Sequence, residues 1–242
     1  MMLLAVLTAV IVACAPPAYS QKFSHGPAPT YCKPALEMKT GTKLDPPPPV
    51  DSRGFDVLAY ELDMRLDPSS STVSGQVVIR LQAEPRGLGQ DLSVIKLDLV
   101  PEMTISGVTD RQGSLAYTHA ASSLEITLRQ PLAAGLIDSL TVTWAGRPPR
   151  HGSFSAGLMF RTHDSGTRTD VSDDVPIVAN LSQTWSAHSW WPCKDHPADK
   201  ALVSLAATVP ETLAVVSNGT LVAVTDAEPG WRRYAWREAF PM

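Results

Sequence analysis

Residues 182–201, SQTWSAHSWWPCKDHPADKA, hold most of the side chains in this sequence that are suited to chemistry. His188 and His196 are candidate metal ligands, with His163 further upstream. Metal-binding histidines on one element usually lie about two to five residues apart, as in HExxH, whereas these two are eight apart. The sequence contains neither HExxH nor Cys-x-x-Cys. Surface or packing roles are therefore predicted for these histidines, and no metal ligand is assigned.

Cys193 is the one candidate nucleophile in the same stretch. His196 follows three residues later, but a proline precedes the cysteine, and two tryptophans lie just before that proline. This context favours a small buried packing residue over a catalytic thiol. The sequence also lacks G-x-S-x-G and a Gly-rich phosphate loop. Three acidic residues of a polar loop could bind calcium, but their spacing matches no calcium loop; they are Asp170, Asp173 and Asp174.

The composition narrows the class of protein that must position these residues. The chain has 242 residues, 44% of them hydrophobic, which is enough for a sizeable core. The net charge of −4 gives no basic excess, so a nucleic-acid partner is not expected. Its cysteines can close at most one disulfide, so no disulfide framework is predicted; they are Cys14, Cys32 and Cys193.

Residues 1–20 are predicted to be an export signal. MMLLAVLTAVIVA is an apolar run that is too short for a typical membrane span. The run IVAC resembles a bacterial lipoprotein box, which would make Cys14 a lipidated membrane anchor. AYS, ending at Ser20, resembles an ordinary cleavage site. No Lys or Arg precedes Lys22, so the start of this signal is atypical. The alternative is a buried apolar N-terminal strand. An exported protein is expected: periplasmic, cell-surface or secreted.

Residues 21–54 are predicted to be a Pro-rich linker. They show no apolar periodicity, and Pro46–Pro49 favours an extended polyproline spacer. A tail packed across the domain surface is the alternative.

From Phe55 onward, the apolar pattern has a period of two. Residues 55–67 alternate apolar and polar side chains, as a half-buried strand requires. Similar runs follow at 76–83, 94–100, 123–132, 138–148, 201–210, 213–225 and 232–239, and residues 151–175 are predicted to be a polar loop. Asn218-Gly219 predicts a hairpin turn between two β-branched runs. The pattern indicates an all-β, antiparallel domain of two packed or partly closed sheets.

Residues 182–201 resemble a landmark of the zinc aminopeptidases of the aminopeptidase N and leukotriene hydrolase type. The matching positions are Pro192, Cys193, Asp195, Pro197, Lys200 and Ala201. VPETLAVVSNGTLV and the strands from Phe55 onward resemble the same amino-terminal domain, in the same order, over about residues 55–242. The resemblance implies a saddle-shaped, sandwich-like all-β domain that packs on a zinc-bearing catalytic domain. Within it, Asp195 and Lys200 would fix the path of the landmark.

The resemblance places one substrate-binding residue in this chain, Gln183. In the family, this position is Glu or Gln and binds the free amine of the substrate. A glutamine oxygen can accept hydrogen bonds from an ammonium group, although more weakly than a carboxylate. His188 stands where the family usually has Arg, which makes any charge pairing there depend on pH. Trp185 either lines the first side-chain pocket or packs, and packing is favoured.

The resemblance also implies what this chain lacks. It stops at REAFPM, before the Gly-Ala-Met-Glu-Asn and HExxH segments that supply the zinc ligands, the general base and a second amine contact. The chain is expected to bind no zinc itself and to be inactive alone. Three interpretations remain open. The first is the amino-terminal fragment of an exported zinc aminopeptidase acting on peptides with a free N-terminus. The others are a stand-alone peptide-binding module and a structural β domain.

Overall fold

The polypeptide folds into β-strands, as its two-residue periodicity predicts. The computed structural model describes residues 11–14, 51, 53–85, 91–149, 157–163, 175–182 and 185–240. Within these ranges the secondary structure consists of strands and one 3-10 turn, Ala187–Ser189 (η2). No helical segment in the same ranges is long and apolar enough to cross a bilayer. The all-β prediction is confirmed.

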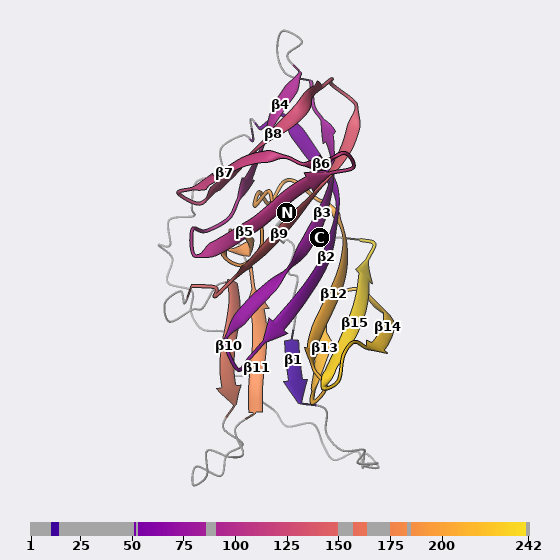
Figure 1. Ribbon diagram of the computed structural model, residues 1–242. Coiled ribbons are helices and arrows are strands. Elements are labelled where there is room, and N and C mark those ends of the chain that lie inside the picture. Colours follow the sequence, from indigo (N-terminus) through magenta and orange to yellow (C-terminus); the bar gives the residue numbers. More distant parts are fainter. Residues whose placement is uncertain are drawn as a thin grey trace, which may run out of the picture. The chain divides into compact units, whose positions relative to one another are not determined.

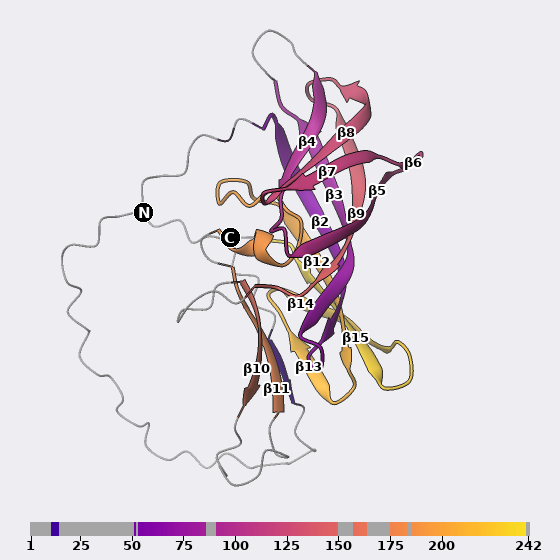
Figure 2. The ribbon, with the colours of Figure 1, turned by 60° about the vertical axis from the view of Figure 1, so that its left-hand side comes forward.

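The strands form three sheets (Figure 1). Their bounds are β1 (Ile11–Cys14), β2 (Phe55–Asp67), β3 (Thr72–Ala83), β4 (Leu92–Asp98), β5 (Met103–Asp110), β6 (Gly113–Ser114), β7 (Ala116–Ala120), β8 (Ser123–Leu132), β9 (Ile137–Gly146), β10 (Gly157–His163), β11 (Val175–Leu181), β12 (Leu202–Pro210), β13 (Leu213–Val216), β14 (Thr220–Asp226) and β15 (Trp231–Glu238). The largest sheet has eight strands in the order β14-β15-β12-β2-β3-β9-β5-β6. A four-stranded sheet has the order β10-β11-β1-β13, and a three-stranded sheet the order β4-β8-β7, whose strands group together in Figure 2.

The alternation in the sequence predicts which faces are buried. In β3, the residues at every second position from Val77 to Ala83 are buried, and the same holds in β9 from Leu140 to Trp144. These faces belong to one apolar cluster that extends across the sheets. Full burial of such a side chain contributes about 1.5–3 kcal/mol. The long strands β2 and β3 therefore form a stable frame for the loops that leave their ends.

The expected antiparallel domain is confirmed, and it differs from the expected two-sheet arrangement in two details. The structure has three sheets, and β2 pairs with β12 in parallel, with Leu62 opposite Leu205. Alternation identifies the buried face of a strand but not its partner, so it gives neither the number of sheets nor the direction of pairing. The stretch 151–175, predicted to be a polar loop, also contains the strand β10, and the strand β11 begins at its last residue, Val175.

The hairpin predicted at Asn218-Gly219 is also wrong, although the turn is present. Gly219 has φ +86, but β13 pairs with β1 while β14 pairs with β15, so the chain changes sheets at this point. A Cβ on Gly219 would collide with the backbone carbonyl of Arg237. Glycine is needed here because the backbone at residue 219 passes close to the backbone of β15, and not because it forms a two-residue hairpin.

Candidate functional site

The loop between β11 and β12, residues 182–201, contacts β2, β4 and β9 through its described residues. It carries the η2 turn and then forms an isolated antiparallel bridge between Cys193 and Asp98. In this bridge, the Asp98 N–H donates to the Cys193 carbonyl over 2.7 Å, and the Cys193 N–H donates back over 3.2 Å. The bridge fixes the middle of the loop at the end of β4.

Trp190 and Trp191 pack the loop onto the core rather than doing chemistry. Trp190 is buried, its Nε1 donates to Ser182 Oγ over 3.2 Å, and its carbonyl accepts from Trp144 Nε1 over 2.9 Å. Trp191 lies edge-on to Tyr60, with ring centroids 4.9 Å apart. Buried indole N–H groups need such acceptors, so these contacts also fix the ring orientations.

The packing role predicted for Cys193 is confirmed. The thiol is buried and free. Burial raises its pKa well above the usual value, and the negative charges of Asp195 and Asp98 raise it further. The sulfur is therefore a neutral thiol at neutral pH, and a neutral thiol is a poor nucleophile.

Among the described residues of the loop, Lys194 is the charged residue that is buried. Its side chain is only 3% exposed, and its Nζ lies 2.6 Å from Asp51 Oδ2 and 2.5 Å from Asp199 Oδ2. The same ammonium donates to the Phe55 carbonyl and lies 4.7 Å from the Phe55 ring centroid. The Lys194 backbone N–H donates to the Tyr60 hydroxyl over 3.0 Å. A buried ammonium needs this set of acceptors, because burial without them strongly disfavours the charge.

The two carboxylates around Lys194 respond in opposite directions. Burial raises the pKa of Asp199 above its usual range, although the hydrogen bond and charge of Lys194 oppose this. Burial also tends to raise the pKa of Asp51. There, the hydrogen bond from Lys194 and the backbone N–H of Arg53 outweigh it, so the pKa is lowered. Lys194 therefore links the start of β2, through Asp51 and Phe55, to the last part of the loop, through Asp199.

Asp195 holds the first half of the loop. Its Oδ2 accepts from the His188 backbone N–H over 3.2 Å and lies 2.5 Å from His188 Nδ1. The hydrogen bond to Asp195 raises the pKa of His188, burial opposes it, and the charges of Asp195 and Asp98 add to the rise. Asp98 Oδ2 in turn accepts from the Asp195 N–H over 2.9 Å and from Arg53 over 2.7 Å. The role predicted for Asp195 in fixing the loop is confirmed.

The same role predicted for Lys200 is wrong. Lys200 is exposed, and Lys194 makes the ion pairs that hold the loop instead. The only sign of this in the sequence is weak: Lys194 follows the apolar run Trp190–Cys193 and precedes an aspartate. That Asp51 would be one of the partners has no signal in the sequence.

Gln183 lies outside the described residues, but both neighbouring parts of the chain are fixed. Ser182 is buried, its Oγ donates to Asn180 Oδ1 over 2.7 Å, and its carbonyl accepts from the Ser186 N–H over 3.2 Å. Trp185, which was expected to pack, is 39% exposed and lies outside the buried core. The loop therefore presents an exposed aromatic ring two residues from Gln183.

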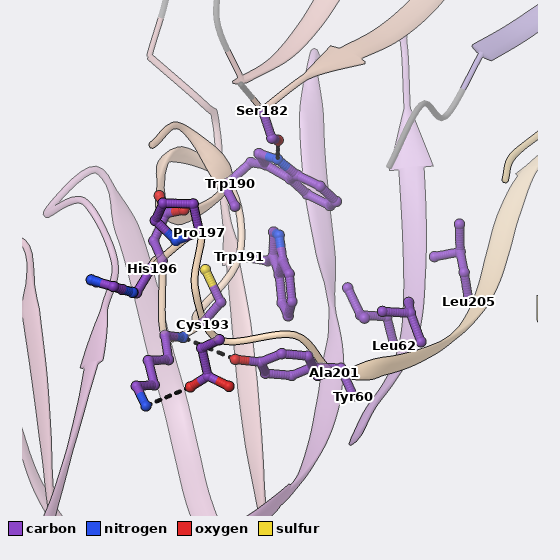
Figure 3. A pocket seen from close by; sticks show the side chains of 15 residues that line it. Tyr60, Leu62, Ser182, Trp190, Trp191, Cys193, His196, Pro197, Ala201 and Leu205 are labelled. Atoms are coloured by element: carbon purple, nitrogen blue, oxygen red, sulfur yellow. Dashed lines mark hydrogen bonds and ion pairs between the residues drawn. The ribbon is translucent and has the colours of Figure 1, made fainter. Parts of the chain in front are cut away.

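A pocket of about 90 Å³ lies beneath the loop (Figure 3). Its walls are mainly apolar and come from β2, β12 and the loop; they include Tyr60, Leu62, Trp190, Trp191 and Leu205. Among the described residues, no group of three or more His, Cys, Asp or Glu side chains is placed to hold a metal ion. His188 Nδ1 is already engaged with Asp195, and the side chain of His163 lies outside the described residues. The described residues of the site thus offer a loop held by hydrogen bonds and ion pairs, with an apolar pocket beneath it.

The comparisons with known proteins agree with this arrangement. The family model of the peptidase M1 N-terminal domain matches residues 57–242, so the chain belongs to this family. Its structure is similar to that of an M1 zinc metallopeptidase from Deinococcus radiodurans, with a TM-score of 0.65 and 25% identity. That match covers 78% of this chain and 40% of the other.

Yeast LTA4 hydrolase, solved in complex with bestatin, shares the fold, with a TM-score of 0.57 and 17% identity over 78% of this chain and 27% of that one. No curated protein sequence matches the chain. The chain thus spans less than half the length of the solved relatives that it matches.

Proposed function

We propose that this chain is the amino-terminal domain of an exported zinc aminopeptidase, and that its loop 182–201 helps bind the free amine of peptide substrates. The main support is the family match over residues 57–242, which includes the whole loop. The relatives are zinc metallopeptidases, and one variant of the Deinococcus enzyme was solved with a Tyr-Ser-Ala substrate. Among the described residues no group fits a zinc site, and the proposed enzyme would bind its zinc in the catalytic domain.

Amine binding by Gln183 is supported by the position of this residue in the family resemblance and by the hydrogen bonds of the described residues on either side of it. Ser182 on one side and Ser186 on the other are held by hydrogen bonds, and Trp190 and Asp195 fix the rest of the loop. A glutamine oxygen can accept a hydrogen bond from an ammonium group. An acylated N-terminus lacks this charged donor. Recognition by Gln183 would therefore favour peptides with a free N-terminus.

Export is proposed from residues 1–20, with lipidation of Cys14 or cleavage after Ser20 as the two possible outcomes. Metabolic labelling with a palmitate analogue separates them, because only the first outcome leaves a lipid on the mature protein.

The proposal assigns catalysis to the zinc-bearing domain and not to this one. An activity assay of this chain with zinc and an aminoacyl chromogenic substrate tests that assignment. No turnover is expected, because the chain holds neither a metal site among its described residues nor the HExxH motif. Robust turnover that survives repurification would contradict the proposal.

A further inference from the structure

The η2 turn, Ala187–Ser189, determines where the chain continues after Gln183. The Ser186 N–H donates to the Ser182 carbonyl over 3.2 Å, so the two described serines that flank Gln183 in the sequence are joined directly. Ser189 Oγ donates to the Ser186 carbonyl over 2.6 Å, and the Ser189 N–H donates to the same carbonyl over 3.3 Å. The position of η2 therefore sets the position of Ser186, and with it one end of the segment that contains Gln183.

His188 connects η2 to neighbouring parts of the chain through three of its groups. Its backbone N–H donates to Asp195 Oδ2 over 3.2 Å, and its Nδ1 lies 2.5 Å from the same oxygen. Its carbonyl accepts from the Val100 N–H over 3.0 Å. Of these groups, only the imidazole changes its charge near neutral pH. The His188 side chain is 28% exposed and that of Asp195 only 10%, so water can exchange a proton with the imidazole while its partner stays largely buried.

Two carboxylates and two basic groups meet beside η2. Asp98 Oδ2, at the end of β4, accepts from the Asp195 N–H over 2.9 Å, which places the two aspartates side by side. Arg53 Nη1 lies 2.7 Å from Asp98 Oδ2. With His188 protonated, the four side chains carry two negative and two positive charges. With a neutral imidazole, one negative charge is left over, and repulsion between the partly buried carboxylates opposes the arrangement.

The other described contacts of η2 bring no second cation to Asp195. The strand β10 packs against η2, and a Cβ on Gly157 would collide with Ser189 Oγ. Arg161, the charged residue of β10 whose side chain is described, is exposed, and so is Glu102 beyond Val100. The hydrogen bond to Asp195 raises the pKa of His188 above 6.5, burial opposes the rise, and the charges of Asp195 and Asp98 add to it. The pairing is thus complete below pH 6.5 and is lost as the pH rises through the folded-state pKa.

We propose that His188 is a positioning residue for substrate binding: its ion pair with Asp195 holds η2, and through Ser186 the segment that carries Gln183, in the form that binds the substrate amine. Loss of the proton on the imidazole weakens amine binding and leaves the chemical step unchanged. This rests on the function proposed above, because the bound group is the amine assigned there to Gln183. Proton binding by His188 and amine binding by the loop are then linked, so each strengthens the other.

The test compares wild type, His188→Arg and His188→Gln in the enzyme that also carries the catalytic domain. Arginine keeps its positive charge and glutamine stays neutral at every pH used, while both keep a side-chain donor. KM and kcat for an aminoacyl substrate are measured from about pH 6 to about pH 9, on both sides of the ordinary range of histidine. Ratios between the proteins remove the pH dependence that all three share, including titration of the substrate amine.

Wild type should match His188→Arg at the acidic end and His188→Gln at the alkaline end. The KM of wild type relative to His188→Arg should rise about fivefold between them, the low end for coupling between two sites, because His188 is partly exposed. The kcat ratio should stay near one. If His188→Arg does not fold, the approach of wild type to His188→Gln with rising pH decides the outcome alone.

Amide hydrogen exchange of Ser186 and Trp190 in the same proteins, without substrate, separates positioning from direct contact with the substrate. At the alkaline end both amides should exchange about fivefold faster in wild type than in His188→Arg, and at the acidic end equally fast. Strand β8 should exchange equally in both proteins throughout. His119→Gln is the matched control: it removes a histidine of β7 whose Nε2 lies 3.1 Å from the Leu99 carbonyl, and it should keep the wild-type pH profile.

Three results would each overturn the proposal: parallel KM profiles for wild type, His188→Arg and His188→Gln; a pH effect confined to kcat; and a KM difference with equal exchange at Ser186 and Trp190, since His188 would then act on the substrate directly. Gln183→Ala, measured alongside, keeps the two proposals apart. An unchanged KM in that variant would contradict amine binding by Gln183, while exchange at Ser186 would still decide whether His188 holds the turn.

Discussion

Replacement of Lys194 with methionine tests the claim that a buried ion cluster holds the loop. Methionine keeps the apolar stem of the side chain, but it removes the charge that faces Asp51, Asp199 and the Phe55 ring. Removal of one member of a buried ion pair typically costs about 3–5 kcal/mol, because the other charge stays buried without a partner. Asp51 keeps Arg53 at 3.4 Å, so most of the loss falls on Asp199, which is only 5% exposed.

The expected loss is therefore at the lower end of that range, about 3 kcal/mol of unfolding free energy. For a domain of this size, it corresponds to a drop in Tm of roughly 6–12 °C. Urea unfolding followed by tryptophan fluorescence measures it. Lys96→Met is the matched control, because its pair with Glu125 at 3.1 Å is about half exposed on both sides. An exposed pair contributes less than about 1 kcal/mol.

The pH dependence of the Lys194→Met deficit has a definite sign. Without Lys194, the pKa of Asp199 rises further above its unfolded value, so the variant loses stability as the pH rises through that window. The folded-state pKa of Asp51 is lowered, so its ionised carboxylate stabilises the wild-type fold at pH values above its unfolded-state pKa. The wild type loses this stabilisation as the pH falls through the folded-state pKa. Both effects make the difference between the two proteins shrink toward acidic pH. Asp199→Asn in the Lys194→Met background should recover part of the loss. A Lys194→Met cost equal to that of Lys96→Met at neutral pH would refute the reasoning.

Two further predictions concern the same frame. His188→Gln should cost about 1.5 kcal/mol near pH 6, where a protonated His188 donates to Asp195. Because the folded pKa of His188 lies above its usual value of 6.5, this stability is fully present below pH 6.5 and is lost as the pH rises through the folded pKa. Unfolding curves across this range check it, and a deficit that grows with pH would contradict it. Gly75→Ala should cost about 2–3 kcal/mol, since its Cβ would collide with the backbone carbonyl of Asp63. Gly107→Ala, with open space around the new Cβ, should cost nothing; equal losses in both variants would rule out the collision.

Local alternation was enough to predict most strands and their buried faces. Val77, Ile79 and Leu81 of β3 point into the core because apolar side chains recur at every second position. The hairpin at Asn218-Gly219 failed because a turn signal says nothing about which strand each arm joins, and here the arms join different sheets. Strand partners depend on contacts between distant parts of the sequence, which periodicity does not carry.

In the loop at 182–201, too, local sequence features predicted some roles, whereas roles that depend on distant contacts were missed. The packing of Cys193 followed from its residue type and neighbours, whereas the role of Asp195 followed from the family resemblance. Lys194 did not, because a lysine is among the residues least expected in a core, and its partner Asp51 lies at the far end of the domain's sequence. Lys200 looked equivalent in the sequence but is exposed. Only the fold shows which of the two lysines meets the buried carboxylates.

The most direct test of the account is the Michaelis constant of Gln183 variants in the enzyme that also carries the catalytic domain. Gln183→Ala should raise KM for an aminoacyl substrate by about tenfold, because a hydrogen bond to a charged amine is lost. Gln183→Glu should lower KM, since a carboxylate binds the ammonium more strongly. Gln76→Ala, a glutamine of β3 outside the loop, should leave KM unchanged. Equal KM values for Gln183→Ala, Gln183→Glu and wild type would contradict a role for this loop in binding the substrate amine.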